Sequence, residues 1–291
     1  MTAEPSGPHR VPTPPAGIPR GRVRLGPAEA AIFETFVVPR YLSLFGELAL
    51  EMMADSEGAQ VAHIHCRTGY PDRGIALKLS GAHVVGVDAS KAALELARAK
   101  ASTMPGMVSE YRLCEEFPTS LPASAFSHAL TLHPLASAKE RTEIFEEFLR
   151  LLAPHGQALL AMPLRGSFQE LSDLLREYAL KYDDHEVAAA VERATAVRPT
   201  VEMFGAELEK AGFDFVDVSL RPTTFSFQSG RDLFEDPVAR LLILPEAQLS
   251  LELQDPARAF DYVRDAIDKY WSDGTFELTV NVGCATGRRV A

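Results

Sequence analysis

The sequence predicts an α/β protein: a doubly wound, mostly parallel sheet of seven strands, with helical inserts after the fifth and sixth strands. Three observations lead to this prediction. Short apolar runs alternate with segments of helical periodicity from residue 61 to residue 163. A turn ending at Thr68-Gly69 is followed by a helix and by a strand that stops on Asp88, 19 residues after Gly69, as in nucleotide-binding β-α-β units. The chain has 291 residues, 46% of them hydrophobic, and can therefore bury a core of this size.

Residues 1–27 come before the predicted domain of residues 28–291 and are rich in proline, glycine and arginine. This composition cannot bury enough apolar surface to fold alone, so we predict a disordered tail. Two other interpretations stay open: a proline-rich ligand for a protein partner, from Pro12–Pro15, and a weak basic arm, from Arg20, Arg22 and Arg24. From Ala28 to Met53 apolar residues recur at helical spacing around Pro39, which predicts a pair of helices ahead of the sheet.

Seven segments predict the strands, because each is a short apolar or alternating run bounded by turn residues. They are residues 61–66, 82–88, near 108–113, 126–132, 157–163, 213–220 and 276–284. Helical patterns at 71–80, 91–103 and 138–152 alternate with the first five strands over short connections, which predicts parallel pairing with helices on both faces. The alternation of Phe276 to Cys284 predicts an antiparallel partner for the sixth strand.

Two helical inserts are predicted beyond the fifth strand. The first lies near residues 164–200, where Phe168 to Val197 forms a long helical stretch, and a short helix follows from Val201. The second spans roughly residues 230–271, after the sixth strand. Since the first insert joins two neighbouring parts of the sheet, we expect it to cover a site at the sheet edge.

Charge and hydropathy argue against two classes of partner. The formal net charge of −11 and the pI near 5.3 argue against a nucleic-acid-binding surface, which usually needs a basic stripe. No run of about 18 apolar residues appears, and the amino terminus lacks the apolar region of a signal peptide, so we predict no membrane insertion.

The odd number of widely spaced cysteines, Cys66, Cys114 and Cys284, is typical of a reducing compartment. We therefore predict a cytoplasmic protein, and a homodimer or another protein partner stays open.

Residues 61–69 read Val-Ala-His-Ile-His-Cys-Arg-Thr-Gly, and the next strand ends on an acid. This segment resembles the class I S-adenosylmethionine-dependent methyltransferases, whose first motif usually reads V-L-D-V-G-C-G-T-G and whose second ends in an acid. The resemblance covers residues from about 28 to 291, and it implies a Rossmann-like methyltransferase fold with S-adenosylmethionine as the cofactor. Its implied cofactor site consists of His65, Arg67, Thr68, Gly69, Asp88 and Ala89, with Glu115 or Glu116 near the adenine. Asp88 takes the ribose-binding position in this site.

The chain departs from the family motif at three positions. The family's acid falls on His63, and its first two glycines fall on His65 and Arg67. Glycines serve in such loops because they reach positive φ and let the backbone approach the ligand. The Arg67 side chain must therefore swing away from the methionine moiety of the cofactor, and His63 cannot replace the missing carboxylate.

Two functions are consistent with these residues. One is methyl transfer to a small or lipid-like acceptor, with the helical inserts shaping the acceptor site. His133, in Thr131-Leu132-His133-Pro134 at the end of the fourth strand, is the predicted general base for that reaction. The other is a catalytically inactive pseudo-methyltransferase that serves as a regulatory or scaffolding protein.

Two further patterns carry weaker interpretations. His63, His65 and Cys66, joined by His133, suggest zinc ligands, but no recognised spacing of four ligands appears, so we predict no metal site. Val282 to Gly287 looks like a glycine-rich nucleotide loop, yet only four residues follow it. No crossover helix and second strand fit in that length, so we predict a strand end there.

Overall fold

The computed structural model describes residues 24–134 and 137–290. Its seven-stranded sheet has the order β3-β2-β1-β4-β5-β7-β6, and β7 runs antiparallel to both of its neighbours while the other pairs are parallel. The strands are β1 (Gln60–Ile64), β2 (His83–Asp88), β3 (Val108–Leu113), β4 (Phe126–Leu132), β5 (Leu152–Pro163), β6 (Phe213–Phe227) and β7 (Phe276–Arg289). The structure confirms the predicted doubly wound, mostly parallel sheet and its antiparallel last strand.

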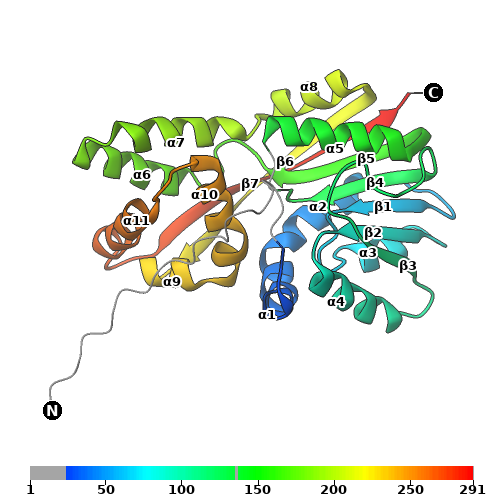
Figure 1. Cartoon of the computed structure of the whole chain (residues 1–291), viewed down its shortest axis with the longest axis horizontal. Helices are drawn as coiled ribbons and strands as arrows, with labels where there is room; N and C mark the ends of the chain where they lie inside the picture. Colours follow the sequence, from blue (N-terminus) through cyan, green and yellow to red (C-terminus); the bar gives the residue numbers. More distant parts are fainter. Residues whose placement is uncertain (1–23, 135–136, 291) are drawn as a thin grey trace, which may run out of the picture.

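Helices cover both faces of the sheet (Figure 1). On one face, α5 (Ala138–Leu151) buries its apolar side chains against β4 and β5, and α8 (Val201–Ala211) packs beside it against β6 and β7. On the other face lie α2 (Ser43–Met52), α3 (Asp72–Lys78) and α4 (Lys91–Ser102). The core on this second face continues from α2 into the helices of the two inserts. The inserts are therefore packed as part of the same hydrophobic core.

The predicted pair of helices ahead of the sheet is instead one helical run. It consists of α1 (Pro27–Ile32), a π-helical segment η1 (Phe33–Leu42) and α2, and the residues at both junctions keep right-handed helical backbone angles. Pro39 lies inside η1. A proline has no N–H for the helical hydrogen-bond pattern, and here the backbone continues through it in wider π turns without a break.

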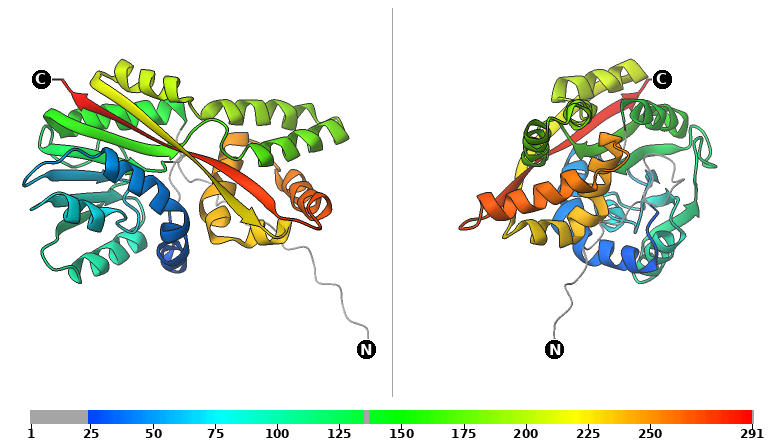
Figure 2. Two further views of the ribbon diagram at one scale, coloured as in Figure 1. Left: turned by 180° about the vertical axis from the view of Figure 1, so that it is seen from behind. Right: turned by 60° about the vertical axis from the view of Figure 1, so that its left-hand side comes forward.

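The last two strands are longer than the sequence predicts. β6 has 15 residues and β7 has 14, and β5 pairs only with Val282 to Arg288 of β7. Beyond that pairing, β6 and β7 continue as a two-stranded ribbon that leaves the sheet and runs among the insert helices (Figures 1 and 2). The segment Val282 to Gly287 lies inside β7, where β5 pairs with all of it and β6 pairs with Val282 to Thr286. It is therefore part of a strand and no nucleotide loop, although the strand continues beyond it to Arg289.

The inserts form what we call the helical lobe, packed around the end of the ribbon. It contains α6 (Gln169–Tyr182), α7 (His185–Val197), α9 (Gly230–Glu235), a π-helical segment η2 (Ala239–Ile243), α10 (Leu244–Leu251) and α11 (Ala257–Tyr270). The long helical stretch that the sequence predicts from residue 168 to 197 is divided at Asp183, which has a left-handed φ of 53°, and Asp184 caps α7.

The predicted tail, residues 1–27, lies outside the described residues except for residues 24–27. Within the described ranges, none of the helices combines the length and the apolar character that crossing a bilayer requires.

Candidate functional site

The carboxyl ends of β1, β2, β3 and β4 lie along one edge of the sheet, the edge that faces the helical lobe (Figure 1). In open α/β sheets this edge is where ligands bind. Each predicted site residue follows one of these strands: the loop His65 to Gly69 after β1, Asp88 and Ala89 at the end of β2, Glu115 and Glu116 after β3, and His133 after β4. The structure therefore brings the predicted residues to a common edge.

The loop after β1 has the backbone of a glycine loop but keeps only the last of its three glycines. His65 has a φ of 53° and Arg67 a φ of 47°, both in the left-handed region, and Gly69 has a φ of 77°. His65 and Arg67 stand at the first two glycine positions of the methyltransferase motif. A side chain in this region costs roughly 1–2 kcal/mol per residue, so the fold stabilises a loop shape that the two residues disfavour by themselves.

The Arg67 side chain bridges the ends of β1 and β4. Its guanidinium donates hydrogen bonds to the carbonyl oxygens of Leu132 at 2.8 Å and His133 at 2.7 Å. It also lies over the ring of Phe33, 5.6 Å from the ring centroid. The guanidinium thus crosses the sheet edge between the glycine-type loop and the end of β4, and its charge is held there by two carbonyl dipoles.

Asp88 is buried at the end of β2 and bonds to its own chain. One carboxylate oxygen accepts from the backbone N–H of Ser90 at 2.8 Å, and the other accepts from the backbone N–H of Arg67 at 3.0 Å. Burial raises the pKa of Asp88, although these hydrogen bonds oppose the shift. The Ser90 hydroxyl donates to the carbonyl oxygen of Leu25 at 2.7 Å, and Leu25 is itself buried. The segment before α1 therefore covers the end of β2, where the sequence predicts ribose binding.

The remaining predicted cofactor residues also have partners within the chain. Glu115 forms an ion pair with Arg24 at 2.8 Å, and both side chains are about half exposed. Glu116 is exposed, and its carbonyl oxygen accepts from the thiol of Cys114. Thr68 is buried, and its carbonyl oxygen accepts from the Lys100 ammonium at 3.0 Å.

A buried network next to the loop is not evident from the sequence. His63 Nδ1 lies 2.6 Å from a carboxylate oxygen of Asp72, and the other oxygen accepts from the Tyr111 hydroxyl at 2.7 Å. All three side chains are buried, and burial raises the pKa of Tyr111. His63 occupies the position of the family's acid, and the carboxylate that it contacts, that of Asp72, comes from α3. The one signal in the sequence was an acid directly after Tyr70-Pro71, where the helix begins.

This network also bears on the zinc interpretation. His63 is held by Asp72, and His65 lies against the ring of Phe117. Across residues 24–134 and 137–290, no three histidine, cysteine or acidic side chains are grouped as metal ligands.

His133 lies in a second buried cluster. Its Nε2 is 2.9 Å from the Tyr41 hydroxyl and 3.8 Å from a carboxylate oxygen of Glu246, while its Nδ1 has no hydrogen-bond partner among the described residues. Glu246 accepts from Arg198 through its other oxygen at 2.9 Å. Burial, and then the charges of Arg67 and Arg198, lower the pKa of His133 far below its usual range, so the ring is neutral. Sequence reasoning finds His133 but misses its partners, which come from η1, α10 and the end of α7.

The neutral, buried His133 predicts a loss of stability in acid. In the unfolded chain this ring takes up a proton near pH 6.5, whereas in the folded chain its depressed pKa keeps it unprotonated. The free energy of unfolding therefore falls as the pH drops below about 6.5, by up to about 1.4 kcal/mol per pH unit. Burial lowers the pKa of His128 as well, which acts in the same direction.

Denaturant titrations at pH 7.5 and 5.5 measure this effect. His133→Gln is expected to reduce the difference in unfolding free energy between the two pH values. His185→Gln, at a surface position that is 91% exposed, serves as the control and should leave the difference unchanged. An unchanged difference in His133→Gln contradicts the prediction.

Comparisons with known proteins agree with the fold. Residues 63–160 match the family model of a methyltransferase domain. At the level of sequence, no curated protein matches the chain. Among solved structures, a candidate methyltransferase from Bacillus halodurans C-125 is similar with a TM-score of 0.53 and 16% identity, over 84% of this chain and 99% of that chain.

Two other solved structures are similar to this chain over most of its length. The [4+2]-cyclase SpnF is similar with a TM-score of 0.51 and 14% identity, over 94% of this chain and 99% of that chain. Phosphoethanolamine N-methyltransferase 2 of Haemonchus contortus, bound to phosphomonomethylethanolamine and S-adenosylhomocysteine, has a TM-score of 0.51 and 16% identity, over 91% of this chain and 57% of that chain. At these identities the likeness concerns the fold. Residues 63–160 therefore match a methyltransferase domain, and the chain has the fold of the class I S-adenosylmethionine-dependent methyltransferases.

Proposed function

We propose that this chain is a pseudo-methyltransferase, a regulatory or scaffolding protein whose cofactor site is filled by its own residues. The observation that carries the proposal is the position of Arg67, whose guanidinium bonds to the carbonyl oxygens of Leu132 and His133. That position lies between the loop after β1 and the end of β4, where the methionine half of the cofactor would need to lie. Its occupation by a side chain argues against binding.

Charge supports the same conclusion. The sulfonium of S-adenosylmethionine is a cation, and two like charges about 4 Å apart repel by about 4 kcal/mol at the effective dielectric of a protein surface. The family's compensating acid is absent, because His63 stands in its place and is bonded to Asp72. A positively charged Arg67 beside the loop, with no acid at position 63, does not fit the sulfonium of S-adenosylmethionine.

The chain's own residues also occupy the adenosine half of the site. Asp88 accepts from the backbone N–H groups of Arg67 and Ser90, and Leu25 is buried beside it. Glu115 is paired with Arg24. A nucleoside would therefore have to displace the segment before α1 and break contacts that the chain already makes.

Calorimetric titration of the full chain with S-adenosylmethionine and with S-adenosylhomocysteine tests the proposal. We expect no binding heat up to millimolar ligand, while an active class I methyltransferase in the same buffers serves as the positive control. Micromolar binding overturns the proposal. In that case Asp88→Ala identifies the site, since it should abolish binding if Asp88 holds the ribose.

Methyl transfer to a small or lipid-like acceptor is the second candidate function. The observation that favours it is the buried cluster of His133, Tyr41 and Glu246 at the sheet edge beside the helical lobe. The ring is neutral, as a general base must be before it accepts a proton, but its lowered pKa makes it a weak base where it now lies. This function requires Arg67 to leave its carbonyl partners, so the same titration separates the two candidates.

For either function we infer a cytoplasmic location, because Cys66, Cys114 and Cys284 are all free thiols. As a regulatory or scaffolding protein, the chain would bind a protein partner. As a methyltransferase, it would bind a small-molecule acceptor. Light scattering of the purified chain would measure whether it forms a homodimer.

A further inference from the structure

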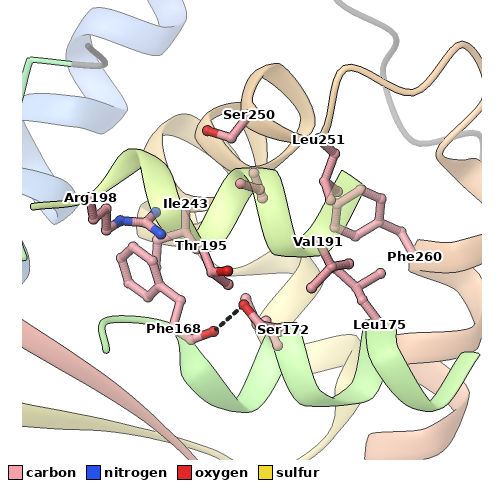
Figure 3. Close-up of a pocket in the computed structure, with 13 residues that line it drawn as sticks. Phe168, Ser172, Leu175, Val191, Thr195, Arg198, Ile243, Ser250, Leu251 and Phe260 are labelled. Carbon is pink, nitrogen blue, oxygen red and sulfur yellow. Dashed lines mark hydrogen bonds between the residues drawn. The ribbon is translucent and has the colours of Figure 1, made fainter. Parts of the chain in front are cut away.

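The helical lobe contains two adjoining pockets that the cofactor site does not explain. One is apolar and lies among α6, α7, α10 and α11, where Leu175, Val191, Leu251 and Phe260 point toward a common space (Figure 3). The other is polar and lies at the start of α6, next to the end of α7. Thr195 and Arg198 line both pockets, so the two spaces meet at these residues.

The polar pocket has one arginine without an acidic partner. Arg165, Arg176 and Arg198 line it together with Glu192. Arg176 pairs with Glu192 at 2.7 Å and with Asp173 at 2.8 Å, and Arg198 pairs with Glu246. Arg165 instead donates to the carbonyl oxygens of Arg198 and Ala196, and no ion pair joins it to an acid in the described part of the chain. The uncompensated charge of Arg165 favours an anionic ligand.

Arg198 provides the second observation. It is only 9% exposed, its guanidinium lies over the ring of Phe168 at 4.8 Å, and one of its terminal nitrogens donates to Glu246. Its Nε has no hydrogen-bond partner among the residues that the structure describes. A buried donor without an acceptor is costly, so this nitrogen requires an acceptor from a ligand or a water molecule.

The start of α6 adds further donors to the same pocket. Gly166, Ser167 and Gln169 line it, and α6 begins at Gln169 without a side-chain cap. The amide groups of the first helical turn are therefore available to an anion, and the helix dipole favours negative charge there. Together with the arginines, they surround one polar space.

We propose that the polar pocket binds the anionic group of a small amphipathic molecule, a carboxylate or a phosphate, and that the apolar pocket receives its short apolar end. The free volume is about 310 Å³ in the polar pocket and about 30 Å³ in the apolar one. The ligand therefore has a tail of only a few carbons. This site does not depend on S-adenosylmethionine, and it holds whether or not the chain transfers methyl groups.

NMR titration of the full chain with butanoate, butyl phosphate, butanol and inorganic phosphate tests the proposal. We expect butanoate or butyl phosphate to bind at least about tenfold more tightly than butanol. The two anions distinguish a carboxylate from a phosphate site. Equal binding of butanol, or no binding of either anion at millimolar concentration, overturns the proposal.

Two variants assign the binding to these pockets. Arg165→Gln removes an exposed guanidinium of the polar pocket and should weaken anion binding about tenfold. Arg231→Gln makes the same charge change on α9, where Arg231 is 77% exposed and outside both pockets, and should leave binding unchanged. If both variants weaken binding equally, the anions respond only to net charge and the site is wrong.

The apolar pocket has its own variant. Ala194 lines it from α7, and Ala194→Leu fills part of its small volume. We expect this variant to bind inorganic phosphate as the wild type does and to lose its preference for butyl phosphate over inorganic phosphate. A preference that survives contradicts the assignment of the tail.

Discussion

Arg67→Gly is expected to give the protein measurable affinity for S-adenosylmethionine and S-adenosylhomocysteine, with a gain of at least tenfold, or about 1.4 kcal/mol. The substitution removes the guanidinium that bridges the loop to Leu132 and His133, and it frees their carbonyl oxygens. It also places glycine at a φ of 47°, a conformation that glycine adopts without strain. Calorimetric titration of variant and wild type measures the gain.

The two ligands separate charge from volume. S-adenosylmethionine carries a sulfonium charge that S-adenosylhomocysteine lacks, so removal of the Arg67 charge should favour the first ligand more than the second. Arg67→Ala provides the matched control, because it removes the same side chain but keeps a strained residue in the left-handed region. If neither variant gains affinity, the segment around Leu25 closes the site independently of Arg67.

Restoring the family's acid requires a change at a second position. The sequence suggests that an acid at position 63, together with glycines at 65 and 67, would raise cofactor affinity. In the structure, His63→Asp would place a second buried carboxylate beside Asp72. Like charges in a buried site are unfavourable, so His63→Asp alone should lower the unfolding free energy. The variant that tests whether an acid at position 63 raises cofactor affinity is therefore His63→Asp combined with Asp72→Asn, because it avoids two neighbouring buried carboxylates.

Glu246→Gln is expected to lower the free energy of unfolding by about 3 kcal/mol. Glu246 and Arg198 form an ion pair at 2.9 Å, and both side chains are about 10% exposed. Removing one charge of a buried pair leaves the other without compensation, and this costs more than the pair itself contributes. The substitution keeps the shape of the side chain, so the effect isolates the charge. Urea titration monitored by circular dichroism measures it.

The control is the same substitution at an exposed ion pair. Glu235 pairs with Arg231 on α9, and these side chains are 62% and 77% exposed. Exposed pairs of this kind contribute about 0.5 kcal/mol or less. Equal losses in Glu235→Gln and Glu246→Gln would contradict the view that burial makes the Glu246 pair important. Replacing both Arg198 and Glu246 by methionine should recover part of the loss, because no uncompensated charge stays buried.

The sequence determines the framework of this protein. Apolar runs of strand length alternate with helical periodicity, and this local pattern decides the order of elements from β1 to β5. The interval from Gly69 to Asp88 is a local feature of one β-α-β unit, and it places both residues at the carboxyl edge of the sheet, where the structure has them. The same reasoning locates His133, since the end of a parallel strand lies at that edge.

Only the tertiary structure decides how those residues are used. The direction of Arg67 depends on carbonyl groups 65 and 66 residues away, and the partners of His133 come from η1 and α10. His63 is held by Asp72, nine residues further along the chain. The β6–β7 ribbon extends beyond β5 and lies among the helices of the helical lobe (Figure 2). Hydrophobic periodicity specifies which face of a helix or strand is buried, because side chains a few residues apart in the chain lie on the same face. Hydrogen bonds and ion pairs across long sequence separations depend on where whole elements pack, and that arrangement decides whether this edge holds a cofactor or the chain's own side chains.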